Sequence, residues 1–102
     1  MKYQLTLQFQ ESSIEDYDWL IEIEEKIENT LHTSHEVDGH DFGSGEMNIF
    51  ILTNNPNEAF KEINNNLALN GIKTMKAAYR ELEGEKYTVL WPKDYVGEFE
   101  VK

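Results

Sequence analysis

The sequence predicts an α+β domain in which two helices pack on one face of an antiparallel sheet. Three observations support this prediction: apolar and polar residues alternate at the N-terminus, two later segments repeat apolar residues at helical spacing, and short glycine-containing turns separate the other apolar stretches. The chain has 102 residues, 39% of them apolar, which is enough for one modest core. We therefore expect a single domain over residues 1–102.

The first strand is predicted over residues 3–10 and the first helix over residues 13–31. Every second residue of the strand is apolar, as in a strand that buries one face. Ser12 and Glu15 have the spacing of a capping box at the start of the helix. The helix repeats apolar residues every three or four positions, and its remaining face is almost entirely acidic.

A hairpin and a second helix follow. Residues 36–42 and 46–53 are predicted strands joined by a glycine-rich turn. The second helix is predicted over residues 56–70, because Asn55 can cap it and Pro56 suits its first position.

Two further strands, over residues 75–82 and 87–91, complete the predicted sheet, and residues 93–102 form either a short edge strand or a frayed tail. The order is β-α-β-β-α-β with one additional C-terminal hairpin strand. Right-handed crossovers then place the first and third strands side by side, put both helices on one face and leave the last hairpin at an edge. This is the layout of a ferredoxin-like βαββαβ sandwich.

Three segments of the chain resemble a known family: VDGHDFGSGEMNIF at residues 37–50, AAYREL at 77–82 and YTVLWP at 87–92. They are similar to a family of small bacterial proteins that has no established activity. The resemblance extends over most of the chain and implies a self-contained bacterial domain. It implies no catalytic residue, and a ferredoxin-like architecture serves many different activities.

The charge of the chain is strongly acidic and unevenly distributed. The net charge is −11; residues 1–50 hold twelve acids against Lys2 and Lys26, whereas residues 51–102 hold eight acids against seven bases. Such a field repels nucleic acid and anionic membrane surfaces. It favours a cation or a basic protein as partner.

The composition excludes several other classes. There is no cysteine, so disulfides, thiolate nucleophiles and thiolate metal sites are absent. The N-terminus alternates, and no window approaches 18 apolar residues, so we expect neither a signal peptide nor a membrane span. We expect a soluble, cytoplasmic protein.

One candidate site depends on the register of the predicted hairpin. If Leu5 and Ile49 face the helices, the opposite face carries polar side chains and is uncovered. With a three-residue turn, residues whose numbers sum to 88 lie opposite one another, whereas a two-residue turn exchanges the faces and brings Asp41 to the open face. The three-residue turn places four candidate ligand-binding residues on that face, beside Gln8 and Gln10: Asp38, His40, Glu46 and Asn48.

These residue types permit two kinds of chemistry. Two carboxylates and an imidazole can hold a divalent metal, or an acid can orient His40 as a general base. The hairpin has no ligand pattern typical of a metal site, so we expect no metal and no cofactor. Ser44 lacks the strand-to-helix setting of a catalytic nucleophile. Whether the protein is an enzyme stays open. Arg80, the only arginine, is predicted to pair with Glu46 or Asp38, or to bind the carboxylate of a ligand.

The second candidate surface is the acidic helix. Tyr17, Trp19 and the carboxylates around them can form an aromatic and acidic recognition surface, although a partly buried helix edge is the commoner explanation for Trp19. The leading hypothesis is a non-catalytic protein-binding or regulatory module that contacts a basic protein. A second copy of the chain, forming a homodimer, is an alternative partner. The alternative is a small-molecule or enzymatic site around His40, Glu46 and Arg80. The predicted partner-binding residues are Trp19, Glu22, Glu25 and Glu28.

Overall fold

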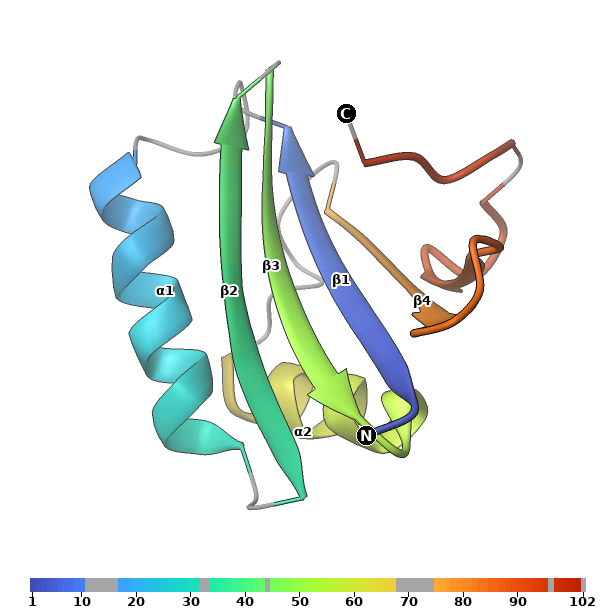
Figure 1. Ribbon diagram of the computed structural model, residues 1–102. Coiled ribbons are helices and arrows are strands. Elements are labelled where there is room, and N and C mark those ends of the chain that lie inside the picture. Colours follow the sequence, from blue (N-terminus) through green and yellow to red (C-terminus); the bar gives the residue numbers. More distant parts are fainter. Residues whose placement is uncertain (11–16, 32–33, 44, 68–74, 96, 102) are drawn as a thin grey trace.

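A computed structural model of the chain describes residues 1–10, 17–31, 34–43, 45–67, 75–95 and 97–101. Within these residues the chain forms one antiparallel sheet with two helices (Figure 1), which confirms the predicted α+β class. The sheet order is β2-β3-β1-β4-β5. The elements in chain order are β1 (Tyr3–Gln10), α1 (Tyr17–Thr30), β2 (His35–Gly43), β3 (Glu46–Thr53), α2 (Pro56–Leu67), β4 (Lys76–Glu81) and β5 (Thr88–Trp91).

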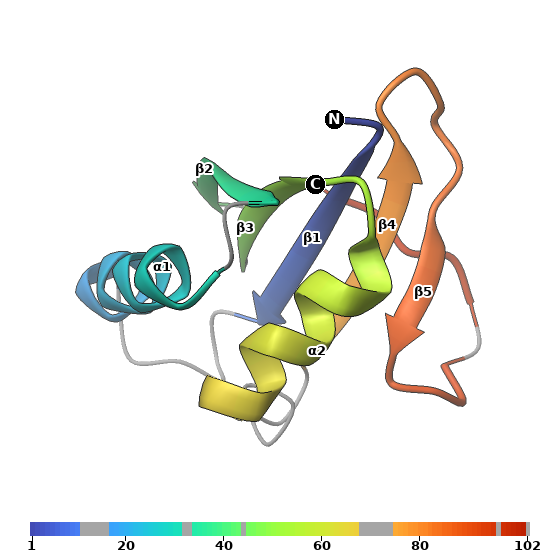
Figure 2. The ribbon, with the colours of Figure 1, turned by 90° about the horizontal axis from the view of Figure 1, so that it is seen from below.

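The two central strands follow the predicted alternation. β1 lies between β3 and β4, and Leu7 is opposite Ile49 on one side and Ala77 on the other. All three side chains are buried on the face that both helices cover (Figure 2), because apolar residues of α1 and α2 pack against them. The core side chains contributed by the helices are Leu20, Ile23 and Ile27 of α1 and Ala59 and Ile63 of α2.

The start of α2 is as predicted. Asn55 caps the helix, since its side-chain Oδ1 accepts a hydrogen bond from the backbone N–H of Glu58 at 3.1 Å, and Pro56 occupies the first helical position. The predicted cap of the first helix and the predicted end of the second lie at residues 11–16 and 68–74, outside the described residues.

The predicted register of the β2–β3 hairpin is wrong for residues 39–43, whereas Val37 lies opposite Ile51 as predicted. Gly43 lies opposite Glu46, so two residues, not three, form the turn, and His40 lies opposite Ile49 while Asp41 lies opposite Asn48. Gly45, with a φ of 81°, adopts the left-handed conformation that such a short turn requires. The register shifts by one residue at Asp38, where the strand bulges.

The face of the sheet opposite the helices, called the outer face below, is not uncovered. Figure 1 shows the C-terminal segment, described over residues 92–95 and 97–101, returning toward the end of β1. There Phe99 is buried against Tyr87 with ring centroids 4.9 Å apart, and the carbonyl of Glu100 accepts a hydrogen bond from the side chain of Gln8 at 2.8 Å. The described residues of this segment form no strand, yet they cover part of the outer face.

Candidate functional site

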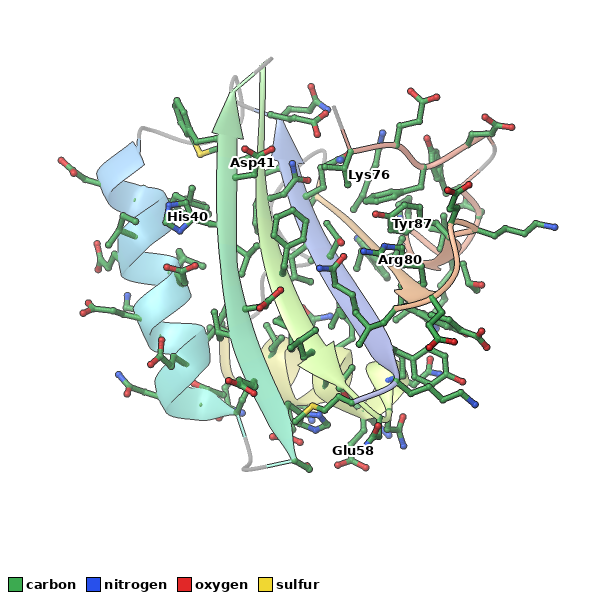
Figure 3. The ribbon with its side chains drawn as sticks, viewed as in Figure 1. His40, Asp41, Glu58, Lys76, Arg80 and Tyr87 are labelled. Atoms are coloured by element: carbon green, nitrogen blue, oxygen red, sulfur yellow. The ribbon has the colours of Figure 1, made fainter. Side chains whose placement is uncertain are left out.

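His40 lies on the opposite side of the sheet from its predicted position. The register turns its ring toward α1 (Figure 3), where Nδ1 lies 3.0 and 3.2 Å from the two carboxylate oxygens of Glu24. Both side chains are partly buried. His40 therefore joins the edge strand β2 to α1 and is not beside Glu46 or Asn48.

Asp38 and Asp41 are both exposed on β2. Asp38 lies at the bulge, next to Gly39, whose φ of 131° is accessible mainly to glycine. Asp41 is on the outer face opposite Asn48, which is the arrangement expected from the two-residue turn. The shorter turn therefore exchanges the two faces of β2 over residues 39–43, and the bulge returns residues 35–37 to the predicted pairing.

Glu46 and Asn48 do lie together, but they are buried. With Gln8 they form the outer-face polar cluster: the Gln8 amide donates to Glu46 and to the Asn48 carbonyl oxygen, both at 3.1 Å, and the Asn48 amide donates to Glu46 at 3.0 Å. Only 4% of Glu46 is exposed. Because these polar groups satisfy one another beneath the C-terminal segment, the cluster serves as packing for the outer face.

Arg80 stabilises the loop that follows its own strand. Its Nη1 donates to the carbonyl oxygens of Glu81, Leu82 and Gly84 at 3.1–3.2 Å. It forms no ion pair with any residue in the described part of the chain, and it lies opposite Gln4, away from Glu46. The hollow beside it is lined by Tyr3, Tyr79, Arg80, Glu81, Lys86 and other residues of that loop.

The predicted ligand-binding residues are thus not gathered in one place. His40 is on the helix side, Arg80 is near the β4–β5 loop, and Glu46 is enclosed beneath the C-terminal segment. The structure gives these residues no shared pocket in which an acid, a base and an arginine act on one molecule.

Half of the exposed carboxylates of the described residues lie on two elements, α1 and the edge strand β2, where a single lysine offsets them. On α1, Asp18, Glu22 and Glu25 follow spacings of four and three residues and so lie along one line of the helix, away from the core. Lys26, the only lysine or arginine in α1 or β2, pairs with Glu22 at 3.2 Å. We call the following seven exposed residues the acidic surface: Asp18, Glu22, Glu25 and Glu28 of α1 and Glu36, Asp38 and Asp41 of β2.

Trp19 is not part of this surface. Its ring packs edge-on against the buried Phe9, with centroids 5.4 Å apart and planes at 82°, and the side chain is partly buried against the core. Of the four residues predicted to bind a partner, three are exposed carboxylates and Trp19 anchors the helix.

The arrangement around His35 was not predicted from the sequence. The ring is buried, with its Nε2 at 3.1 Å from Glu62 and 3.4 Å from Glu58, and its Nδ1 at 2.7 Å from the Thr53 hydroxyl. A signal was present, since Glu58 and Glu62 are four residues apart and must share one face of the predicted helix. Nothing in the local sequence, however, shows that this face meets the start of β2.

Comparisons with known proteins give no match: no protein-family model, no curated protein and no solved structure is similar to the chain. Neither of the two helices in the described ranges is long and apolar enough to cross a membrane.

Proposed function

We propose that the protein is a non-catalytic binding module that captures a basic protein through its acidic surface. The observation that carries the proposal is that two adjacent elements, α1 and β2, hold seven exposed carboxylates against one lysine. Charges of one sign on adjacent elements add to a field that accelerates encounter with an oppositely charged partner. The seven residues belong to α1 and β2, which lie side by side at one edge of the sheet (Figure 1).

The packing of α1 supports this role. The helix is fixed to the domain by a buried apolar stripe, by Trp19 on Phe9 and by Glu24 on His40. Its outward line of carboxylates is therefore presented by a rigid element, and a partner does not have to order the helix on binding.

The same charges disfavour two alternative uses of this edge. A second copy of the chain approaching through its own acidic surface would place like charges together, which costs several kcal/mol at an interface. The second disfavoured use is pairing of the edge strand β2 with a strand of another chain, because acidic side chains and a bulge hinder such pairing. This protection is compatible with binding a basic partner.

We also infer that the fold is ferredoxin-like. Four of the strands have the order β4-β1-β3-β2, α1 connects β1 to β2, and α2 connects β3 to β4, while β5 extends the β4 edge. We also propose that the protein is bacterial and cytoplasmic, as the sequence leads us to expect. Because this architecture serves many activities, it gives the acidic surface a rigid support without specifying a reaction.

The test compares two variants with the same net charge. One carries Glu22→Gln, Glu25→Gln and Glu28→Gln in the acidic surface; the control carries Glu81→Gln, Glu83→Gln and Glu85→Gln at the other edge, where all three residues are also exposed. Each variant reduces the net charge from −11 to −8. Basic proteins that copurify with the tagged wild-type protein from bacterial lysate are identified and then used as purified partners.

The proposal expects the acidic-surface variant to associate with the copurified partner about tenfold more slowly at low salt, and the control variant to associate at nearly the wild-type rate. Equal slowing of both variants would show that net charge alone matters. Unchanged association of the acidic-surface variant would exclude α1 as the contact.

A further inference from the structure

We propose that His35, Glu58 and Glu62 bind a divalent first-row transition metal ion, with Zn²⁺ as the representative ion. These three residues, called the His35 site below, lie where β2 begins, β3 ends and α2 starts; Glu58 marks this end of the molecule in Figure 3. The site is formed by residues that belong neither to the acidic surface nor to the outer-face polar cluster.

The donor set determines the class of ion. One imidazole nitrogen and two carboxylate oxygens are ligands of Zn²⁺, Mn²⁺ and similar ions, whereas Mg²⁺ and Ca²⁺ favour sites made of oxygen alone. Three protein ligands leave at least one coordination position for water or for a group of a partner.

The distances fit a shared ion. The Nε2 of His35 lies 3.1 Å from Oε2 of Glu62 and 3.4 Å from Oε1 of Glu58, and the three donor atoms all lie within 4.8 Å of one another. An ion held about 2.1 Å from each donor places neighbouring donors about 3–3.5 Å apart. The Glu58 side chain is 55% exposed, so a small rotation of it completes the set without disturbing the core.

The charges around the ring also favour a cation. The His35 side chain is only 1% exposed, and both carboxylates approach the same ring nitrogen. A ring nitrogen carries at most one proton, so Nε2 can donate one hydrogen bond, and the contact with Glu62 has the geometry for it. The contact between Nε2 and Glu58 is longer. A divalent ion between the three donors balances both carboxylates at once.

Residues outside the donor set hold the ligands in position. The Thr53 hydroxyl contacts Nδ1 at 2.7 Å and so directs Nε2 toward the carboxylates. The same hydroxyl accepts a hydrogen bond from the backbone N–H of Asn55 at 2.9 Å. In a capping box, the side chain of Glu58 would accept that hydrogen bond instead. Thr53 therefore frees Glu58 to face His35.

The first experiment is calorimetric titration of chelator-treated protein with ZnCl₂, with MgCl₂ and CaCl₂ as comparison ions, together with thermal unfolding. The proposal expects one Zn²⁺ per chain and little heat from Mg²⁺ or Ca²⁺. At free Zn²⁺ about 100-fold above Kd, Tm should rise by about 10 °C. Absence of Zn²⁺ binding by the wild-type protein would overturn the proposal.

Matched variants locate the ion. Glu58→Gln with Glu62→Gln should weaken Zn²⁺ binding by about 100-fold or more, whereas the control, Glu24→Gln with His40→Gln, removes the other histidine–carboxylate pair and should leave the affinity unchanged. The double glutamine variant is used because replacement of the buried His35 ring risks unfolding. Equal affinity of this variant and wild type, or loss of binding in the control alone, would contradict the assignment.

A spectroscopic readout separates metal ligation from a purely structural ion pair. Zn²⁺ on Nε2 leaves the ring proton on Nδ1, so the ¹⁵N spectrum of the His35 ring should change on titration while that of His40 does not. Thr53→Val should weaken binding by about 10- to 100-fold, as loss of an orienting hydrogen bond does at other metal sites. A His35 ring signal that is unchanged at saturation would exclude this histidine as a ligand.

Discussion

The outer-face polar cluster and the acidic surface are both built from polar side chains, but their surroundings give them opposite roles. Glu46 is buried and accepts hydrogen bonds from Gln8 and Asn48, so its carboxylate holds the outer face together. The carboxylates of Glu22 and Glu25 are exposed to water and contribute mainly to the external field. Burial, and not residue type, separates structural acids from those available to a partner.

The largest effect on stability should come from the segment that covers the cluster. Phe99→Ala removes a ring that is only 7% exposed and packs on Tyr87, so we expect the free energy of unfolding to fall by about 3 kcal/mol. Phe42→Ala is the control, because Phe42 is 40% exposed and should lose less than about 1 kcal/mol. Urea unfolding measures both; equal losses would show that the C-terminal segment does not cover the outer face.

The next effect should come from the cluster itself. Glu46→Ala leaves the amide groups of Gln8 and Asn48 without their shared acceptor, and we expect a loss of about 2 kcal/mol. Glu46→Gln keeps one acceptor oxygen and should lose clearly less. Neither change should alter capture of a basic partner. A Glu46→Ala variant as stable as wild type would contradict the structural role of this carboxylate.

Two buried threonines give a smaller pair of effects with opposite signs. The Thr53 hydroxyl contacts His35 and Asn55, so Thr53→Val should destabilise by about 1 kcal/mol. The Thr6 hydroxyl, on the outer face, has no hydrogen-bond partner among the described residues, so Thr6→Val should stabilise by about 1 kcal/mol. Thermal and urea unfolding of the two variants should shift in opposite directions, and a loss of stability in Thr6→Val would reveal a partner for that hydroxyl.

The smallest effect on stability should come from the acidic surface. Glu22→Gln, Glu25→Gln and Glu28→Gln change exposed side chains, so the free energy of unfolding should change by less than about 0.5 kcal/mol. The triple change breaks the ion pair between Glu22 and Lys26, which is exposed and therefore weak. Urea unfolding at two salt concentrations measures this effect; a decrease of several kcal/mol would assign these acids to the fold instead of to a partner.

The elements with strong periodicity could be predicted from the sequence. The bounds of β1 and β3, the cap of α2 and the core parity of Leu7 and Ile49 all follow from local pattern. The hairpin register could not be predicted with the same certainty, because one residue in the turn decides which face of β2 carries His40 and the bulge at Asp38 changes the register again.

The covered outer face and the His35 site depend on tertiary contacts that local pattern does not record. Phe99 belongs to a segment whose alternation is too short to show where it docks. The partners of His35 come from two other elements, and only the packing of β2, β3 and α2 brings them together. By contrast, the acidity of α1 was readable directly from its sequence.

The most direct test of the proposed function is the rate of association with the copurified basic partner as a function of salt, measured for wild type, the acidic-surface variant and the Glu81, Glu83 and Glu85 control. We predict a steep decrease of the rate with salt for wild type and the control, and a slower rate that decreases less steeply with salt for the acidic-surface variant. Identical salt dependence in all three proteins would contradict the role assigned to α1.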